Sequence, residues 1–246
     1  MNKRGQVSIF VIVAIVIVGV ISLLYVFPQI NVFAEEINPT SYMRDCIKPE
    51  LEDIIYVLSS QGGYYSPTNY HRYNDNKIQY LCYIGEDYKP CIIQQPLLKK
   101  KFEDEVIEQI TPVANGCIAN LKKAYDSRGY IIESVPSEFE FKIGLDEMVF
   151  VYSDPITVKK EGTQTFRNIE IELESKLYDL LIISTSIIQE EASVGDSETL
   201  NYMRNYPDLK IVKIRREGTT IYEVSNAITK EKFSFATRSS VLKNII

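Results

Sequence analysis

The chain has 246 residues, of which 45% are hydrophobic and 24% are charged, and its formal net charge is −6. This composition is typical of a folded globular protein and excludes a disordered stalk. The negative net charge also argues against nucleic acid as a partner, because nucleic acid is bound by concentrated Lys and Arg side chains.

The N-terminal stretch from Val7 to Phe27 carries no charge, and Ser8 and Ser22 are its polar residues. As a helix it would span about 31 Å, which matches the hydrocarbon core of a bilayer. Lys3 and Arg4 come just before it, so the positive-inside rule predicts a cytoplasmic segment over 1–6. We therefore predict a transmembrane helix over 7–27 in contact with the lipid bilayer, an N-terminus in the cytoplasm and the rest of the chain outside the cell.

A removable signal peptide is the alternative to an anchor. Val32-Phe33-Ala34 places small residues at the positions that a signal peptidase inspects, which would allow cleavage before Glu35. The apolar region of a signal peptide is usually about 7–15 residues long, shorter than the stretch in this chain, so the sequence favours the anchor.

The residues after the anchor predict a linker over 28–39, a helical subdomain over 40–128 and a β-rich subdomain with helices over 129–246. In the helical subdomain, Thr40 or Ser41 is the expected cap of a helix that ends near Ser60, before Gly62-Gly63. A second helix is expected from Leu97 to about Tyr125, with a kink or a break at Pro112. The apolar faces of the two helices are expected to pack together.

The cysteines Cys46, Cys82, Cys91 and Cys117 favour disulfides over metal ligands. They contain no Cys-x-x-Cys pair, and the single histidine of the chain cannot complete the usual zinc sets. Three pairings are possible, and we favour Cys46–Cys117, which joins the two helices, with Cys82–Cys91 closing a small loop. Disulfides fit an oxidising location outside the cytoplasm.

The segment from Tyr64 to Tyr88 holds seven tyrosines among Asn, Asp and Gln residues. Rigid amphipathic rings beside hydrogen-bonding groups suit contact with glycans or protein surfaces. We predict a binding surface at Tyr64, Tyr65, Tyr70, His71 and Tyr73. The alternative is that these rings pack the segment onto the domain beneath it.

From Gly129 onward the apolar residues alternate, as they do in strands. The pattern predicts an antiparallel meander of strands at 130–135, 139–143, 148–152, 156–160 and 166–173. A helix over 177–191, a short helix near Asp196 and strands at 209–214, 220–224 and 233–236 follow. The predicted class is α+β, with an N-terminal transmembrane helix, a disulfide-linked helical part and antiparallel sheets outside the membrane.

No catalytic motif stands out in the sequence, which contains no phosphate loop, nucleophile elbow or His-Glu-x-x-His. His71 lies in a polar, turn-rich stretch that is typical of a solvated side chain. Glu190 and Glu191 are adjacent acids, and Ser240 with Lys243 has a spacing that is common in proteins. We predict no catalytic residue, no metal site and no cofactor.

The N-terminus Lys3-Arg4-Gly5-Gln6-Val7-Ser8, followed by the apolar stretch, resembles archaeal type IV pilin-like proteins. The resemblance implies processing between Gly5 and Gln6 and packing of the apolar helix in a filament. The family usually has a glutamate five residues into the mature chain, where this sequence has Phe10. The remainder resembles secreted, single-anchor proteins of small archaea, a likeness that implies no activity.

Three functions follow from these features. The first is a single-pass surface protein with a structural, adhesive or binding role, whose partners are copies of itself, other cell-surface proteins or glycans. The second is a type IV pilin-like filament subunit. The third is an extracytoplasmic hydrolase, which a deep cleft lined by convergent acids would indicate.

Overall fold

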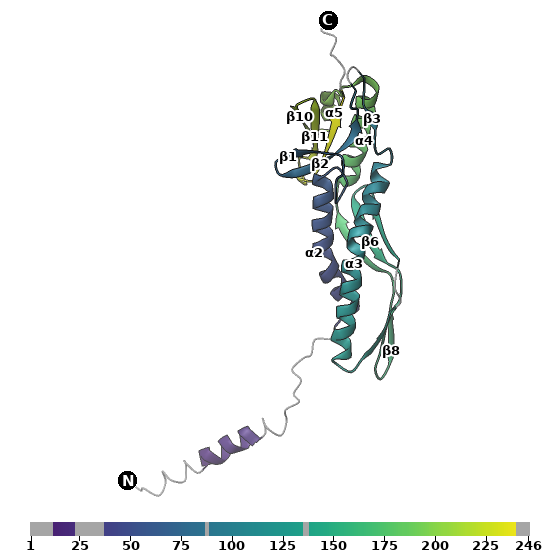
Figure 1. Cartoon of the computed structure of the whole chain (residues 1–246). Helices are drawn as coiled ribbons and strands as arrows, with labels where there is room; N and C mark the ends of the chain where they lie inside the picture. Colours follow the sequence, from purple (N-terminus) through teal and green to yellow (C-terminus); the bar gives the residue numbers. More distant parts are fainter. Residues whose placement is uncertain (1–11, 23–36, 87–88, 135–137, 240–246) are drawn as a thin grey trace, which may run out of the picture. The chain divides into compact units, whose positions relative to one another are not determined.

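The computed structural model describes residues 12–22, 37–86, 89–134 and 138–239 of the chain. The chain separates into two compact units, Met1–Ile37 and Asn38–Ile246. Residues 12–22 of the first unit form a helix with exposed apolar side chains. Every other helix and strand belongs to the second unit, which Figure 1 shows in blue through yellow.

The structure contradicts the prediction of a transmembrane helix over 7–27. The helix over 12–22 rises about 16 Å, roughly half of the 30 Å that a bilayer core requires. Among the described residues, no helix combines the length and the apolar character needed to cross a membrane. The two ends of the predicted span, 7–11 and 23–27, lie outside the described residues.

Helix α2, Pro39–Ser60, begins one residue before the expected caps. The Asn38 side chain is the cap, and its Oδ1 accepts hydrogen bonds from the backbone N–H groups of Thr40 at 2.9 Å and Ser41 at 3.2 Å. Pro39 suits the first helical position, where a backbone N–H has no partner in the helix. One face of α2 is buried, as the spacing predicts, and it consists of Met43, Ile47, Leu51, Ile54 and Leu58.

Helix α3, Leu98–Asp126, is one continuous 29-residue helix that includes Pro112. The sequence allows a kink or a break at this proline, and α3 has no break there. The apolar stripe of α3, from Phe102 through Ile110 to Leu121, is buried. Helices α2 and α3 lie side by side in Figure 1, and the Cys46–Cys117 disulfide joins them with a Cα–Cα distance of 6.0 Å. Both disulfides have the favoured pairing, since Cys82 is bonded to Cys91.

The predicted meander forms a long three-stranded antiparallel ribbon that packs against α3. The ribbon is interrupted near its middle and therefore consists of two three-stranded sheets, with orders β5-β6-β9 and β4-β7-β8. Its strands are β4 (Ile131–Glu133), β5 (Phe139–Ile143), β6 (Glu147–Tyr152), β7 (Ile156–Lys159), β8 (Thr163–Phe166) and β9 (Ile169–Glu174). The strand expected over 166–173 is divided at Asn168, whose φ of 52° turns the backbone.

A six-stranded sheet at the other end of the unit has the order β1-β2-β12-β11-β10, with β3 paired to β2. Its strands are β1 (Tyr70–Tyr73), β2 (Asn76–Tyr83), β3 (Ile92–Ile93), β10 (Leu209–Arg216), β11 (Thr219–Asn226) and β12 (Lys232–Arg238). Helix α4, Leu177–Val194, packs on this sheet, and the short α5, Thr199–Asn205, contacts β10. The α+β class with antiparallel sheets and two disulfides is confirmed.

The β1–β2 hairpin is the main element that the sequence pattern did not predict. Its turn residues Asn74 and Asp75 have φ values of 45° and 65°, the conformation of a tight hairpin turn. Strand β2 then pairs in parallel with β12, more than 150 positions later in the sequence. The unit Asn38–Ile246 therefore shares one sheet between the predicted helical and β-rich subdomains.

The acids that follow Lys99-Lys100-Lys101 differ sharply in burial, although each pairs with the lysine four residues before it. Glu103 accepts a hydrogen bond from the backbone N–H of Ile143 at 2.9 Å and so attaches α3 to the end of β5. Glu105 accepts one from the N–H of Tyr65 at 3.1 Å and holds the segment after α2. The carboxylate of Asp104 is exposed and bonds to Lys100.

We expect Glu105→Ala to lower the free energy of unfolding by about 2 kcal/mol, because a partly buried N–H and a lysine lose a charged partner. The matched control Asp104→Ala removes an exposed pair and should cost about 0.5 kcal/mol or less. Urea titrations followed by circular dichroism measure both values. Equal losses would show that the Glu105 contact does not stabilise the fold.

Removal of the Cys46–Cys117 disulfide by replacing both cysteines with alanine should destabilise the unit by about 4 kcal/mol. The reason is that the bond closes a sequence separation of 71 residues and so restricts the unfolded chain. Denaturant unfolding without reductant measures the loss. The difference from the native chain should disappear in strong reductant, and a difference that persists would assign the loss to packing at these positions.

Candidate functional site

An open groove of about 1110 Å³ lies on the second unit. Three parts of the fold form its walls, namely the last turns of α2, the strand β9 and the sheet strands β10 to β12 with their connecting turn. The turn of the β1–β2 hairpin reaches it through Asn76. We call this hollow the α2–β9 groove.

Tyr56 presents the largest exposed ring in the α2–β9 groove. Its side chain is 73% exposed, and it lies on the face of α2 opposite to the buried stripe that ends at Leu58. The sequence does contain one signal for Tyr56: a large aromatic side chain on the polar face of a helix is a candidate for binding a ligand. The apolar pattern alone could not place it beside β9 and β11.

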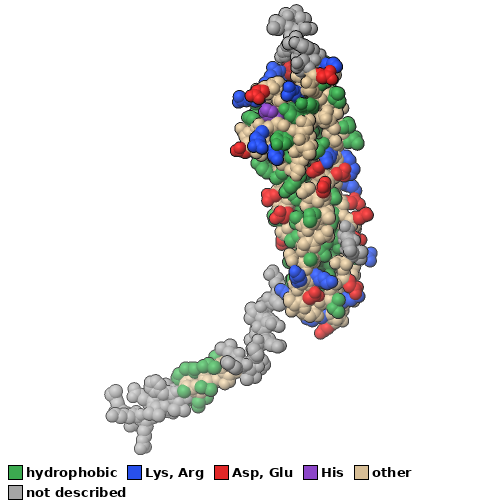
Figure 2. Space-filling model, viewed as in Figure 1, with side chains coloured by type: hydrophobic (Ala, Val, Ile, Leu, Met, Phe, Trp, Pro, Cys, Tyr) green, Lys and Arg blue, Asp and Glu red, His purple; other side chains and the backbone are tan. Residues whose placement is uncertain are grey.

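Positively charged, negatively charged and amide side chains line the groove together with Tyr56. The lining contains the lysines Lys48, Lys210, Lys230 and Lys232, the glutamates Glu52, Glu172, Glu174, Glu223 and Glu231, and the amides Asn76 and Asn226. Two ion pairs lie on its walls: Lys48–Glu52 at 3.8 Å within α2, and Lys232–Glu223 at 3.3 Å between the neighbouring strands β12 and β11. The groove therefore has nearly balanced charge. Figure 2 shows that red and blue side chains also occur together over the face of the unit that it views.

Glu231 has a structural role at the wall of the groove. Its carboxylate accepts hydrogen bonds from the Ser175 hydroxyl and from the backbone N–H of Lys176 at 2.7 Å, so it ties the start of α4 to the β11–β12 turn. Glu172 and Glu174 lie on the exposed face of β9, whose burial alternates with each residue. These two carboxylates are open to a ligand.

Tyr64 and Tyr65, the first two predicted binding residues, lie against α3. The Lys101 ammonium lies 4.8 Å from the centre of the Tyr64 ring, and burial raises the pKa of the Tyr64 hydroxyl. The Tyr65 backbone is held by Glu105, while its side chain is 41% exposed. Their contacts attach the segment after α2 to α3.

Tyr70, His71 and Tyr73 form a second group on β1. The Lys77 ammonium lies 5.2 Å from the Tyr70 ring, His71 pairs with Ile78 across the hairpin, and Tyr73 packs on a cluster that includes Ile78 and Tyr80. All three are partly buried. None of the five predicted residues is among those that line the α2–β9 groove.

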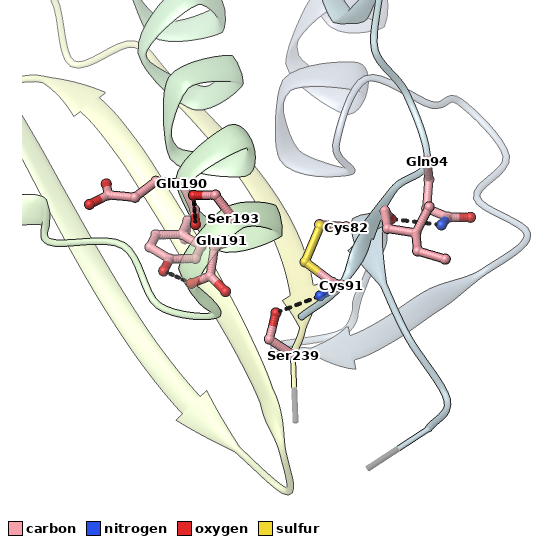
Figure 3. Close-up of a disulfide and its surroundings, with 9 residues drawn as sticks. Cys82, Cys91, Gln94, Glu190, Glu191, Ser193 and Ser239 are labelled. Atoms are coloured by element: carbon pink, nitrogen blue, oxygen red, sulfur yellow. Dashed lines mark hydrogen bonds between the residues drawn. A yellow bond between two sulfur atoms is a disulfide. The ribbon is translucent and has the colours of Figure 1, made fainter. Parts of the chain in front are cut away.

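The Cys82–Cys91 disulfide joins β2 to the residue before β3 (Figure 3). Both cysteines are buried, and the Cys91 N–H donates to the Ser239 hydroxyl at 3.2 Å. The hydrogen bond from Cys91 to Ser239 holds the end of β12 beside the disulfide.

The predicted processing residues, Gly5 and Gln6, lie outside the described residues.

A buried acid lies at the end of α4 near this disulfide. The Glu191 side chain is 1% exposed and accepts a hydrogen bond from the Tyr222 hydroxyl of β11. Burial raises the pKa of the Glu191 carboxyl, against the opposing effects of the Tyr222 hydrogen bond and the Lys213 charge. Burial and the charge of Glu191 raise the pKa of Tyr222 as well.

Asp196 joins this cluster to β10. Its carboxylate bonds to Lys213, and both of its oxygens accept from Arg215 at 2.9 Å. Burial would raise the pKa of Asp196, but the hydrogen bonds from Lys213 and Arg215 outweigh it and the pKa is lowered. The Lys213 ammonium also lies 5.3 Å from the Tyr222 ring. Every member of the cluster is engaged by a neighbour, which indicates a structural junction between α4 and the sheet.

Within the described ranges, no group of three or more His, Cys, Asp or Glu side chains could hold a metal ion. Comparison with known proteins gives no match to a family model, to a curated protein or to a solved structure. The groove and the disulfides are therefore the features of this chain that bear on its function.

We expect titration of Glu191 to reduce stability as pH rises. The folded chain holds the Glu191 proton more tightly than the unfolded chain, so this group stabilises the fold below about pH 4.5 and the benefit is lost at higher pH. Glu191→Gln removes the titration. The free energy of unfolding of the native chain, measured relative to this variant, should therefore fall between acidic and neutral pH.

The neighbouring Glu190→Gln is the matched control, since Glu190 is half-buried and bonds to the Ser197 hydroxyl. Urea unfolding at a series of pH values measures all three chains. A difference between the native chain and Glu191→Gln that stays constant with pH would contradict a raised pKa at Glu191.

Proposed function

We propose that this chain is an extracytoplasmic surface protein that binds a neutral glycan in the α2–β9 groove. Its role is adhesive or structural rather than catalytic. The observation that carries the proposal is the exposed Tyr56 ring inside a groove lined by amides, carboxylates and lysines. The proposal includes no membrane helix.

The two disulfides support a location outside the cytoplasm. Cys46, Cys82, Cys91 and Cys117 are all paired, so the fold has no free cysteine. Disulfides persist in oxidising compartments and are rare in the reducing cytosol of most organisms. The bond between α2 and α3 also supports the packing of the helix that carries Tyr56.

The chemistry of the groove supports a sugar as the ligand. A sugar ring offers an apolar C–H face and an edge of hydroxyl groups. The flat Tyr56 ring suits the face, while Asn76, Glu172 and Glu174 supply donors and acceptors for the hydroxyls. The charges of the groove are nearly balanced, which favours a neutral ligand over a polyanion.

The pairing of the acids supports binding over hydrolysis. Glycosidases use two carboxyl groups that flank the bond to be cleaved. Here Glu52 and Glu223 pair with lysines, and Glu231 holds backbone and hydroxyl groups. Glu172 and Glu174 are two residues apart on one exposed face of β9, and the groove is open. The pilin-like alternative depends on residues 3–10, which lie outside the described ranges.

We expect Tyr56→Ala to weaken glycan binding about tenfold, because loss of one stacked ring costs about 1.4 kcal/mol. Tyr206→Ala is the matched control, since Tyr206 is 56% exposed and is not part of the groove lining. The probes are soluble neutral oligosaccharides, titrated into the full chain and followed by the NMR shifts of groove residues.

Affinity for a neutral sugar should change little between low and high salt, because no net charge is screened. Equal binding by Tyr56→Ala and Tyr206→Ala would show that Tyr56 is not the platform. Release of shorter sugars from the probes would show that the hydrolase alternative is correct. Binding to none of the oligosaccharides by the native chain would overturn the glycan proposal.

A further inference from the structure

Strand β8 leaves one edge of the long ribbon open. It is the outermost strand of the sheet β4-β7-β8, and within the described residues it pairs with β7 alone. In an antiparallel pair, alternate backbone N–H and C=O groups point away from the partner strand. Such an edge is a template for another strand unless the protein blocks it. Figure 1 shows β8 at the end of the unit away from the sheet that contains β10 and β11.

The strand that continues the same edge is blocked. Helix α2 runs beside β9, and the Arg44 guanidinium donates to the Glu170 carbonyl at 3.5 Å. Three acids project from the exposed face of β9, and they would repel the same strand of another copy. The start of α2 reaches Asn168, since Thr40 and Arg44 share a hollow with that residue. Helix α2 therefore covers the edge of β9 as far as Asn168 and leaves the edge of β8 uncovered.

The edge strand β10 of the six-stranded sheet is also blocked. The N–H of Leu209 donates to the Tyr206 carbonyl at 2.9 Å, and the N–H of Ile211 contacts the Met203 sulfur at 3.3 Å. Strand β10 is rich in basic residues, which discourage pairing with an identical strand. Of the remaining edge strands, β3 has two residues, β1 carries the exposed cation Arg72, and α3 holds the other two: Glu103 binds the end of β5, and α3 packs on β4.

The sequence of β8 has none of these protective features. Thr163-Gln164-Thr165-Phe166 contains no charge and no proline, and its first three side chains are exposed. Threonine and phenylalanine favour strands, and Thr–Thr pairs across strands can hydrogen bond. The strand can therefore face an identical strand without repulsion between charges.

We propose that β8 pairs with β8 of a second copy of this chain and joins two ribbons into one continuous sheet. Two-fold antiparallel pairing places one residue opposite its own counterpart, so the centre of the contact is Gln164 or Thr165. Either centre opposes uncharged polar side chains. This inference is independent of glycan binding, because no residue of β8 lines the α2–β9 groove.

The contact is small and the dimer is weak. Four residues a side bury far less than the roughly 1,200 Å² of a standard protein interface. Association therefore depends on a high local concentration, such as copies crowded on one surface, where linked or confined partners bind at high effective concentration. A method that traps transient contacts is needed to detect it.

The test is disulfide trapping in the full chain. The four native cysteines are paired, so Gln164→Cys and Thr165→Cys each add one thiol that can react. Under mild oxidation, the variant at the centre of the contact should form a covalent dimer on non-reducing gels at least tenfold faster than Gln189→Cys. Gln189 is an exposed position of α4 and serves as the control.

A second substitution makes the result specific to the edge. Addition of Thr163→Lys to the trapping variant should abolish the fast cross-linking, because it places a charge on the open edge of each copy. Trapping no faster than the control would overturn the proposal. So would a monomer whose β8 amides are strongly protected from hydrogen exchange, because another segment of the same chain would then cover the edge.

Discussion

The packing of α3 against α2 is the contact on which the rest of the second unit depends. The buried stripe of α3 lies between α2 on one side and the ribbon of β4 to β9 on the other. The Cys46–Cys117 bond makes the helix pair covalent, and Glu103 and Glu105 attach the ends of neighbouring segments to α3. Because α2 is held at this position, its outer face, with Tyr56, forms one wall of the α2–β9 groove. The proposed binding surface thus depends on the packing of the helix pair.

Several acids of the second unit have structural roles, since buried charges are stable only when they are paired or hydrogen bonded. Glu103 and Glu105 hold backbone groups, Glu191 is enclosed with Tyr222, and Asp196 is bound by two basic residues of β10. The surfaces that remain for partners are those where the fold leaves groups unused. They are the α2–β9 groove with its exposed ring and the open edge of β8.

The rings of the tyrosine-rich segment lie in two different parts of the fold. Tyr64 and Tyr65 pack toward α3, whereas Tyr70 and Tyr73 belong to the β1–β2 hairpin and contact Lys77 and the sheet. Many rings in one stretch of sequence therefore divide between two regions of the surface. Tyr56, which the sequence presents as one residue of a helix, lines the groove because β9 and β12 lie beside α2. The groove brings together segments that are far apart in the chain, and the spacing of residues within one segment does not predict such contacts.

The sequence by itself determined the α+β class, the helices α2, α3 and α4 and most strands of the ribbon, and it favoured one of the three possible pairings of the four cysteines, which is the pairing in the structure. These features depend on local periodicity, turn residues and cysteine count, which act over a few residues or are limited to few combinations. It misplaced the cap of α2, predicted a transmembrane helix and did not predict the β1–β2 hairpin. Tertiary structure alone decided the parallel pairing of β2 with β12, the burial of Glu191 and the groove around Tyr56. Each of these joins residues far apart in the chain, and the free energy that selects them comes from burial and hydrogen bonding between elements.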